Sequence, residues 1–397
     1  MERTKRRLLI LLVPVCCLFY LSQHHRVFFA QGTFNFGSKL LDTDTLEDPV
    51  HGGVNATLGF GAVVAVSHAS SPRREGLLWA AKLTGVEITI PPQPQWTEDD
   101  LQAFKSKKSS KIDRGSALAW MGHLNALRWF LSTPFETALI IEDDVDLSLH
   151  LPSQITLASH ALRTLLTPTA TLSIPNTTIN TDPHFWAAPS TWEILWLGHC
   201  NDAASPHHIL THPSLAYPDP HMPPLSSIAA PASDLLRSFN LSDTRLVYKS
   251  YWPLCTFAYA VTRASAARIL SAYATEGPDG CVAYDVRMLE ACRDHGWKCW
   301  TVAPELFHHM AGKSEIAALN DVQAKNGSDN KGAQRQEETE RRGPSVNIEC
   351  AARNEGLWVD KEDTEGRRVM LEKVREAGRK GECFVGERGQ RTLAGMH

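Results

Sequence analysis

The stretch Leu139-Ile-Ile-Glu-Asp-Asp-Val-Asp146 places a continuously apolar run directly before four carboxylic acids. Residues 138–141 predict a short strand that is buried on both faces, because a strand with one wet face would alternate apolar and polar residues. In an open α/β sheet, ligands gather at the carboxyl ends of the strands, so the pattern predicts a ligand site where this strand ends. The acids at that point are Glu142, Asp143, Asp144 and Asp146.

Carboxylates crowded at one point of the chain need a compensating positive charge. Two of them about 4 Å apart repel each other by about 1 kcal/mol in water and by about 4 kcal/mol at an effective dielectric constant of 20. A bound cation or proton uptake relieves the repulsion. Oxygen ligands favour Mn²⁺ or Mg²⁺, and we expect Asp144 to be the first metal ligand, with Asp146 completing an Asp-x-Asp pair. A solvated acidic turn or a helix cap is the alternative without a function.

A divalent ion held by few carboxylates commonly binds a diphosphate and neutralises the charge on a leaving group. The sequence contains no GxxxxGK[ST] loop, so phosphate binding would depend on the metal. The pattern therefore favours a nucleotide-sugar or a related diphosphate donor. Nucleic acid is excluded as a partner, because a formal net charge of -4 provides no basic field for its backbone.

The segments on either side of this stretch alternate between strand and helix patterns. Residues 62–66 predict a buried strand, and residues 72–83 predict the helix that follows it. An amphipathic helix is expected over 116–131, shortly before the acidic strand. This alternation predicts an α/β fold for a domain over 59–320. Further strands are expected at 88–90, 194–197, 256–261 and 297–302, and further helices at 264–273 and 285–293.

Three segments lack such patterns. The polar segments 167–191 and 199–245 are each either a functional lid or disordered, since loops of this length are uncommon inside a compact domain. Residues 321–397 contain 30 charged residues among 77, against 54 among the 320 residues before them. Such a charged segment cannot bury a core of its own, so we expect a flexible or loosely helical tail.

The first 30 residues have the pattern of a membrane-targeting segment, with four basic residues before an uncharged run over 8–21. The run makes roughly 21 Å of helix, short of the roughly 30 Å hydrocarbon core. It is therefore either a cleaved signal peptide or, extended through 27–30, an uncleaved signal-anchor. We favour the anchor, because no convincing small-x-small cleavage site follows the run. Residues 31–58 would form a stem, and the domain would lie in the lumen of the endoplasmic reticulum or Golgi as part of a single-pass type II membrane protein.

Sequons and cysteines agree with a lumenal domain. Seven cysteines follow the apolar run, and an oxidising compartment would pair them. Because seven is odd, at least one has no partner within the chain. No CxxC pair occurs, which argues against a thiolate zinc site. The sequons begin at Asn55, Asn176, Asn240 and Asn326, all in segments expected to be loops.

Five short blocks together resemble glycosyltransferase family 25, which includes the lipooligosaccharide and collagen galactosyltransferases. Each block is weak by itself, and their order and spacing between residues 60 and 315 carry the resemblance. The chain departs from the family at the start, where Val66-Ser-His-Ala-Ser-Ser-Pro-Arg-Arg74 replaces Asn-Leu-x-x-Arg-x-x-Arg. The blocks are Arg114-Gly115, Met121-Gly122-His123, Ile140-Ile-Glu-Asp-Asp-Val145, Tyr251-Trp252 with Phe257-Ala-Tyr259, and Val282-Ala-Tyr-Asp285.

The resemblance implies a GT-A-like nucleotide-sugar-binding domain with a mixed, mostly parallel sheet, a UDP-sugar donor, Mn²⁺ dependence and inversion at the anomeric carbon. Donor contacts are implied for Arg114, His123, Glu142 and Asp143. Without the resemblance, His123 would be taken for a buried structural histidine. A further metal ligand is implied after the last strand, at His308 or His309; an ordinary pair of loop histidines is the alternative.

Inverting transfer needs a base that takes the proton of the acceptor hydroxyl. The resemblance places Asp285 in the family's Val-Asp-Glu block, with Val286 in place of the Glu, and Asp285 is our candidate for the base. The alternative is a cap for the helix over 286–293. Tyr251 and Trp252 are expected either to stack on a sugar ring or to pack in the core.

Together these patterns predict a hexosyltransferase of the secretory pathway. It would transfer a hexose such as galactose from a UDP-sugar to a hydroxyl of a glycan or glycoprotein. Two alternatives stay open: a metal-dependent nucleotide-sugar hydrolase or phosphotransferase, and a catalytically silent lumenal binding protein with the same fold. The missing Asn-Leu pair and the presence of Val286 favour a catalytically silent protein, whereas the full acidic cluster favours an active enzyme.

Overall fold

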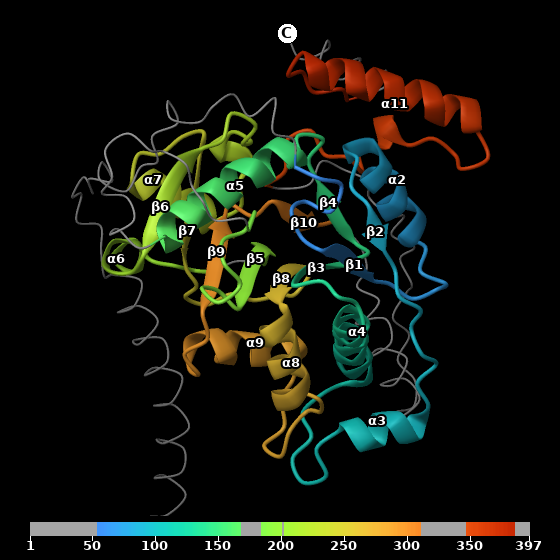
Figure 1. Ribbon diagram of the computed structural model, residues 1–397, viewed down its shortest axis with the longest axis vertical. Coiled ribbons are helices and arrows are strands. Elements are labelled where there is room, and N and C mark those ends of the chain that lie inside the picture. Colours follow the sequence, from blue (N-terminus) through green and yellow to red (C-terminus); the bar gives the residue numbers. More distant parts are fainter. Residues whose placement is uncertain (1–53, 168–183, 201, 311–346, 386–397) are drawn as a thin grey trace, which may run out of the picture. The chain divides into compact units, whose positions relative to one another are not determined.

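The computed structural model describes residues 54–167, 184–200, 202–310 and 347–385 (Figure 1). The predicted signal-anchor at 1–30 and most of the predicted stem at 31–58 lie outside these ranges. Within the described ranges, no helix combines the length and the apolar character needed to cross a membrane. The anchor and the lumenal location therefore stay predictions.

An eight-stranded sheet forms the centre of the described structure. Its order is β2-β1-β3-β8-β5-β9-β7-β6, and β8 and β7 run opposite to the other six strands. The predicted α/β fold with a mixed, mostly parallel sheet is thus confirmed. In chain order the strands are β1 (Ala62–Val66), β2 (Ile88–Thr89), β3 (Thr137–Glu142), β5 (Ile194–Gly198), β6 (Ser214–Pro218), β7 (Thr244–Lys249), β8 (Ala258–Thr262) and β9 (Cys299–Ala303).

A second, two-stranded sheet joins the acidic stretch to the end of the predicted catalytic domain. Its antiparallel strands are β4 (Val145–Leu147) and β10 (Phe307–His309). Asp146 lies opposite His308, and Val145 lies opposite His309. The pairing therefore brings the two predicted groups of metal ligands next to each other, although they are far apart in the sequence.

Helices cover both faces of the large sheet (Figure 1). Val63 and Ala65 of β1 belong to a core shared with α2 and α5, whereas Ala62 and Val64 belong to a core shared with α3, α4, α8 and α9. Successive side chains of a strand point to opposite faces, so a strand buried on both sides must be apolar throughout. The helices are α2 (Arg74–Thr84), α3 (Glu98–Phe104), α4 (Arg114–Leu131), α5 (Leu151–Leu166), α6 (Pro206–Thr211), α7 (Ala232–Ser238), α8 (Arg263–Ala272), α9 (Tyr284–Arg293) and α11 (Thr364–Arg379), with short 3-10 turns η3 (Leu225–Ser227) and η4 (Glu355–Leu357).

The polar segment 199–245 differs from the expected lid or disordered loop. Its described part contains α6, β6, η3 and α7. β6 pairs with β7 and forms one edge of the large sheet. A small core that includes Ile209, Leu236 and Phe239 joins α6 and α7 to these strands. Each of these elements buries only a few apolar residues, which explains why a polar, proline-rich composition concealed them. Of the other predicted lid, residues 168–183 lie outside the described residues.

Residues 347–385 also differ from the expected loose tail, and we refer to them as the C-terminal segment. The segment contains η4 and α11, and the Cys350–Cys383 disulfide closes it. Trp79 of α2 packs in one cluster with Leu357 and Val374 and donates its indole N–H to the carbonyl of Leu357 at 2.8 Å. The segment is therefore part of the folded domain. The rest of 321–397 lies outside the described residues.

Six of the seven cysteines that follow the apolar run form disulfides. The pairs are Cys200–Cys255, Cys292–Cys299 and Cys350–Cys383. The remaining one, Cys281, is buried and unpaired. This pairing agrees with the odd number of cysteines in the sequence.

Candidate functional site

The acidic stretch lies at the carboxyl end of β3, as predicted. Glu142 is the last residue of β3, and its N–H donates to the carbonyl of Phe257 at 2.9 Å. Asp143 and Asp144 form the turn before β4 begins at Val145. We refer to residues 142–146 as the acid turn. Because β1 runs parallel to β3, the residues that follow β1 lie at the same edge of the sheet.

Asp143 faces the loop that follows β1. Its Oδ2 accepts a hydrogen bond from the Ser67 hydroxyl at 2.6 Å, and only 7% of the residue is exposed. Arg74, the first residue of α2, donates to the Ser67 hydroxyl at 3.3 Å and to the Ser67 carbonyl at 2.9 Å. Asp143 therefore connects the acid turn to the start of α2.

Asp144 is the acid whose charge is least compensated. Its Oδ2 lies 3.4 Å from a guanidinium nitrogen of Arg73, whereas its buried Oδ1 has no hydrogen-bond partner in the part of the chain that the structure describes. Burial, with repulsion from Glu142 and Asp143, raises the pKa of Asp144 to about 7. A carboxylate in this position would gain from a bound cation.

Glu142 is held by a buried histidine. His123 of α4 is 2% exposed, and its Nε2 lies 3.2 Å from Glu142 Oε1, while its Nδ1 lies 3.3 Å from the Tyr259 hydroxyl. Burial raises the pKa of Glu142, but the hydrogen bonds from His123 and Thr256 outweigh it and leave the pKa lowered. His123 is thus a buried histidine that also orients Glu142, and its contact with the donor stays a prediction.

Asp146 does not face the same space. It is 1% exposed, and its Oδ1 accepts the backbone N–H groups of Leu147 at 2.8 Å and of Arg353 at 3.0 Å. The Arg353 guanidinium donates to the carbonyls of Asp143 at 2.7 Å and of Arg73 at 3.2 Å. The C-terminal segment therefore supports the acid turn from behind, and Asp146 belongs to that support.

The two histidines of β10 point to different surroundings. His308 Nδ1 lies 2.5 Å from a carboxylate oxygen of Glu305, which also accepts a hydrogen bond from the Asn347 amide at 2.6 Å. His309, in contrast, lines a cavity together with Glu142 and Asp144. Of the two predicted ligands, the structure places His309 with the acids and His308 with a buried polar group beside the C-terminal segment.

Asp285 lies in the first turn of α9, whose N-cap residue is Ala283. Its Oδ1 accepts the N–H of Val286 at 2.9 Å, and its Oδ2 accepts the N–H of Cys255 at 3.0 Å. The helix thus begins before Asp285, which is not its N-cap residue, so the capping alternative is wrong; the carboxylate lies within the first turn and also fixes the disulfide-bonded residue Cys255. It lines the same cavity as His309.

Arg114 is the first residue of α4 and forms an ion pair with Glu98 of α3. It lines a larger cavity that the loop after β1, the loop after β2 and the acid turn enclose. The ion pair holds the guanidinium at the cavity wall. The predicted donor residues Arg114, His123, Glu142 and Asp143 therefore all lie around one space.

Two cavities meet at the acid turn. The first has a volume of about 710 Å³ and the second about 410 Å³. Asp285 and His309 line the second cavity, whereas Asp143 and Arg114 line the first. Neither cavity is lined by Asp146 or His308. The residues common to both linings are Arg73, Ala119, His123, Glu142 and Asp144.

A metal site made only of protein ligands is not present in the described residues. The one group of three His, Cys, Asp or Glu ligand atoms within 4.8 Å of one another there is Glu349 with Cys350 and Cys383, and those two cysteines form a disulfide. The acid turn nevertheless fits a divalent ion that takes part of its shell from a substrate, because Asp144 Oδ1 is buried without a partner among the described residues. Asp144 is the residue that would hold such an ion.

Several site residues were not predicted. Arg73 stands in the loop where the sequence departs from the family pattern, and the two consecutive arginines after Pro72 were the only signal for it. Gln93 lines the first cavity, and its amide nitrogen is buried without a hydrogen-bond partner in the described part of the chain. Arg353 had no signal at all, because its contacts reach residues more than 200 positions away.

Comparison with known proteins identifies no family. The sequence matches no protein-family model and no curated protein. One similar solved structure is a glycosyltransferase involved in the glycosylation of the major capsid of PBCV-1, at 11% identity and a TM-score of 0.22, over 66% of this chain and 98% of that chain. Another is CMP:2-keto-3-deoxy-manno-octonic acid synthetase complexed with CTP, at 14% identity and a TM-score of 0.23, over 67% and 98%. At such TM-scores the likeness carries no argument about function, and the resemblance to glycosyltransferase family 25 stays a prediction.

Proposed function

We propose that the protein is a glycosyltransferase that moves a hexose, such as galactose, from a UDP-sugar to a hydroxyl group of a glycan or glycoprotein. The observation that supports it most is the meeting of two cavities at Arg73, Glu142 and Asp144. A transferase must hold donor and acceptor so that their reacting atoms touch, which two adjoining cavities allow. The ordered sequence blocks that resemble glycosyltransferase family 25 supply the reaction class.

The first cavity suits the nucleotide part of the donor. Its volume of about 710 Å³ lies in the usual range for small-molecule sites. Arg73 and Arg114 bring positive charge to its wall for a diphosphate. Gln93 and Trp96 also line it, and the buried Gln93 amide offers a donor to a base carbonyl such as those of uracil. The diphosphate would then lie at the junction, beside Asp144.

A divalent ion, Mn²⁺ or Mg²⁺, is part of the proposal. Asp144 would hold it, with the other ligands supplied by water and the diphosphate, since Mg²⁺ commonly uses only one or two carboxylates. When bound, the ion neutralises charge that develops on the leaving diphosphate. His309 lines the second cavity together with Asp144 and is our candidate for an additional contact to the ion or to the phosphate.

The second cavity suits the acceptor. Asp285 lines it, and each of its carboxylate oxygens accepts one backbone hydrogen bond, which leaves further lone pairs free. In the proposed step the acceptor oxygen bonds to the anomeric carbon, the bond from that carbon to the diphosphate oxygen breaks, and the acceptor proton passes to Asp285. Attack from the side opposite the leaving group inverts the anomeric centre.

The proposed location is the secretory pathway, with a type II anchor in the Golgi or endoplasmic reticulum membrane. The sequence pattern of residues 1–30 supports it, as do the three disulfides. Asn55 and Asn240 are exposed, as glycan attachment requires. The sequons at Asn176 and Asn326 lie outside the described residues.

One assay tests the proposal. The full-length protein is incubated with a panel of UDP-sugars, with and without Mn²⁺, in the presence and absence of glycan acceptors, and UDP release is measured. Release that requires metal and increases with an acceptor supports the transferase. UDP release at the same rate with and without an acceptor would identify a hydrolase instead. Tight UDP binding without release would identify a silent binding protein, a possibility that the lack of three converging metal ligands among the described residues keeps open.

A further inference from the structure

Two segments that border the second cavity carry exposed apolar side chains. In the described part of the chain, the large apolar residues with exposed side chains are Leu78, Phe135, Tyr251, Trp252 and Val282. Three of these five belong to the segments 251–255 and 282–285, which the hydrogen bond from Cys255 N–H to Asp285 joins. Both segments contribute residues to the second cavity. Exposed apolar groups on segments that border a cavity are a feature of binding surfaces.

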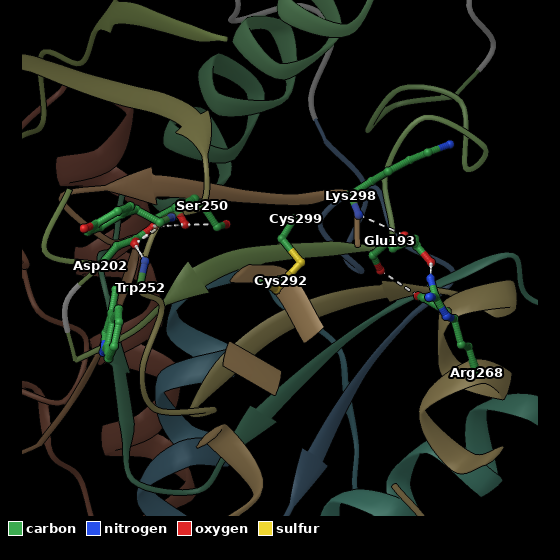
Figure 2. The surroundings of a disulfide bond; sticks show 11 residues. Glu193, Asp202, Ser250, Trp252, Arg268, Cys292, Lys298 and Cys299 are labelled. Atoms are coloured by element: carbon green, nitrogen blue, oxygen red, sulfur yellow. Dashed lines mark hydrogen bonds and ion pairs between the residues drawn. A yellow bond between two sulfur atoms is a disulfide. The ribbon is translucent and has the colours of Figure 1, made fainter. Parts of the chain in front are cut away.

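Hydrogen bonds to a buried carboxylate fix the backbone of the loop that carries Tyr251 and Trp252. Asp202, which is 0% exposed, accepts the backbone N–H of Tyr251 at 2.9 Å and that of Trp252. The same carboxylate accepts the hydroxyl of Thr301 at 2.6 Å. Figure 2 shows Asp202 at the backbone of Trp252, with the indole extending away from Ser250. Burying a carboxylate is costly, and in this place it fixes two exposed aromatic residues rather than a core.

The other end of the loop is fixed as well. Cys255 forms a disulfide with Cys200, and both cysteines line the second cavity. Arg293, the last residue of α9, places its guanidinium carbon 4.2 Å from the centre of the Trp252 ring. The adjacent Cys292–Cys299 disulfide ties that end of α9 to β9 (Figure 2). The aromatic loop, α9 and the cavity therefore form one preorganised surface.

The length of α9 sets the scale of this surface. Asp285 and Arg293 are eight residues apart on the helix, which corresponds to roughly 12 Å at about 1.5 Å per residue. Trp252 lies beside Arg293, whereas Asp285 lies in the cavity. The separation is longer than one sugar ring. A ligand that reaches both must extend over more than one sugar unit.

We propose that Tyr251 and Trp252 form a carbohydrate subsite, which binds a pyranose ring of an oligosaccharide acceptor at a distance from the hydroxyl that reacts. The indole of Trp252 would stack on the apolar face of the sugar with the ring face that Arg293 does not cover. The charged neighbours Arg293 and Asp294, which pair with each other, fit a sugar better than a lipid. This inference rests on the proposed function only in naming the second cavity as the acceptor site.

Direct binding provides the first test. The full-length protein, its Trp252→Ala variant and its Phe135→Ala variant are applied to an array of mono- and oligosaccharides. Phe135 is an exposed aromatic residue outside both segments and serves as the matched control. We expect the unchanged protein and Phe135→Ala to bind particular oligosaccharides, and Trp252→Ala to lose at least tenfold in affinity. Equal binding by all three proteins, or binding confined to lipid-like aglycones, would overturn the subsite.

A kinetic comparison provides the second test. With a donor that is turned over, Trp252→Ala should lower kcat/KM at least tenfold for an oligosaccharide acceptor and leave it unchanged for the methyl glycoside of the terminal sugar. Trp252→Phe, which keeps an aromatic ring, should recover most of the loss. An equal loss on both acceptors would show that Trp252 acts only through the fold, and would overturn the proposal. Calorimetry with UDP and Mn²⁺ tests the proposed function separately: if no binding occurs, the transferase fails, while the array still decides the subsite.

Discussion

The acid turn and the C-terminal segment are in direct contact, yet they differ in how they can be recognised. The acid turn can be recognised from the eight consecutive residues 139–146, in which an apolar strand leads into carboxylates. The C-terminal segment is highly charged, and although α11 has apolar residues at helical spacing, such as Met370, Val374 and Ala377, no pattern around Arg353 predicts the contacts of that residue. Arg353 from that segment nevertheless donates to the carbonyls of Asp143 and Val145. Reactive groups thus have a local signature, whereas the residues that hold them in place do not.

The two regions also differ in what a substitution should change. In the acid turn, Asp144 keeps 23% of its side chain exposed and contacts a cavity. In the C-terminal segment, Arg353 is 9% exposed, and its guanidinium donates to the carbonyl groups of Asp143 and Arg73. We therefore expect substitutions in the first region to change chemistry at nearly constant stability. Substitutions in the second should lower stability and, through it, activity.

The largest effect on activity is expected for Asp144→Asn. Removing the carboxylate charge of Asp144, which lines the junction together with Glu142, should abolish Mn²⁺-dependent UDP binding and lower kcat/KM about 100-fold or more, the usual cost of losing a group that stabilises transition-state charge. The melting temperature should stay constant or rise, because burial and neighbouring acids already raise the pKa of Asp144 to about 7. Calorimetry, UDP release and thermal melting measure these three quantities.

Asp146→Ala is the control for that change. Its carboxylate accepts two backbone N–H groups, so the variant should lose about 1–3 kcal/mol of stability. Mn²⁺ and UDP binding by the folded protein should be unaffected. If Asp146→Ala abolished metal binding while the fold remained intact, the original prediction of Asp146 as a ligand would be right, and the placement of this residue in the supporting structure would be wrong.

Arg353→Ala should have the next largest effect, with a loss of about 2–3 kcal/mol in the free energy of unfolding. The substitution removes the guanidinium donor from the carbonyls of Asp143, Val145 and Arg73, of which that of Arg73 keeps the N–H of Leu77 as a second donor. Urea unfolding measures the loss, and UDP affinity should fall with it because the acid turn and the Arg73 loop lose their common anchor. Arg353→Lys restores one donor and should recover only part of both. An unchanged unfolding curve for Arg353→Ala would break the contrast between the two regions.

Most of the central fold could be predicted because its signals are local. The strand at 62–66 was predicted with the bounds that the structure shows, since both of its faces are buried and every residue is apolar. The helix over 116–131 was found from its period, within two residues of α4. β4 and β10 have three residues each, too few for any period to appear. β6 and α7 lay hidden in a polar segment, because α7 and Ala216 of β6 pack in a small separate core, and only Tyr217 and Leu215 of β6 reach the main one.

The site could be predicted as a cluster but not resolved into roles. Asp144 and Asp146 look alike in the sequence, and only the position at which β4 begins decides which of them faces the cavity. The same holds for His308 and His309, because neighbouring residues of a strand point to opposite sides and the register of β10 is set by β4. Arg353 depends on a contact across most of the chain, for which a single sequence offers no pattern.

The two histidines of β10 repeat the contrast between a residue that lines a cavity and a residue that supports the structure, with smaller expected effects. His309→Ala removes a side chain from the second cavity and should lower kcat/KM about tenfold, less than the roughly 100-fold or more of a general acid or base, because we expect His309 to make only an additional contact. His308→Ala should leave kcat/KM of the folded protein unchanged and lower its melting temperature, since the buried carboxylate of Glu305 loses one hydrogen-bond partner. Steady-state kinetics and thermal melting on both variants decide this, and the reverse pattern would contradict the assignment of the two residues.

The smallest expected effect is the change of stability with pH. It comes from His150, which lies near the contact between the C-terminal segment and the residues that follow the acid turn. His150 is adjacent to Leu149, whose N–H donates to the carbonyl of Cys350, and it stacks on His221 at 3.8 Å between ring centres. Burial and the charge of His221 lower the pKa of His150 to about 4, although Asp219 acts in the opposite direction. The folded-state pKa is below the unfolded value of 6.5, so the unfolded chain takes up the proton first as the pH falls. Stability should therefore be complete above about pH 6.5 and decline toward pH 4, by about 1 kcal/mol once solvent screening is allowed for. Urea unfolding at pH 7.5 and pH 5 should show this decline in the unchanged protein and a smaller decline in His150→Gln. Equal declines in both proteins would show that the pH dependence of stability does not come from His150.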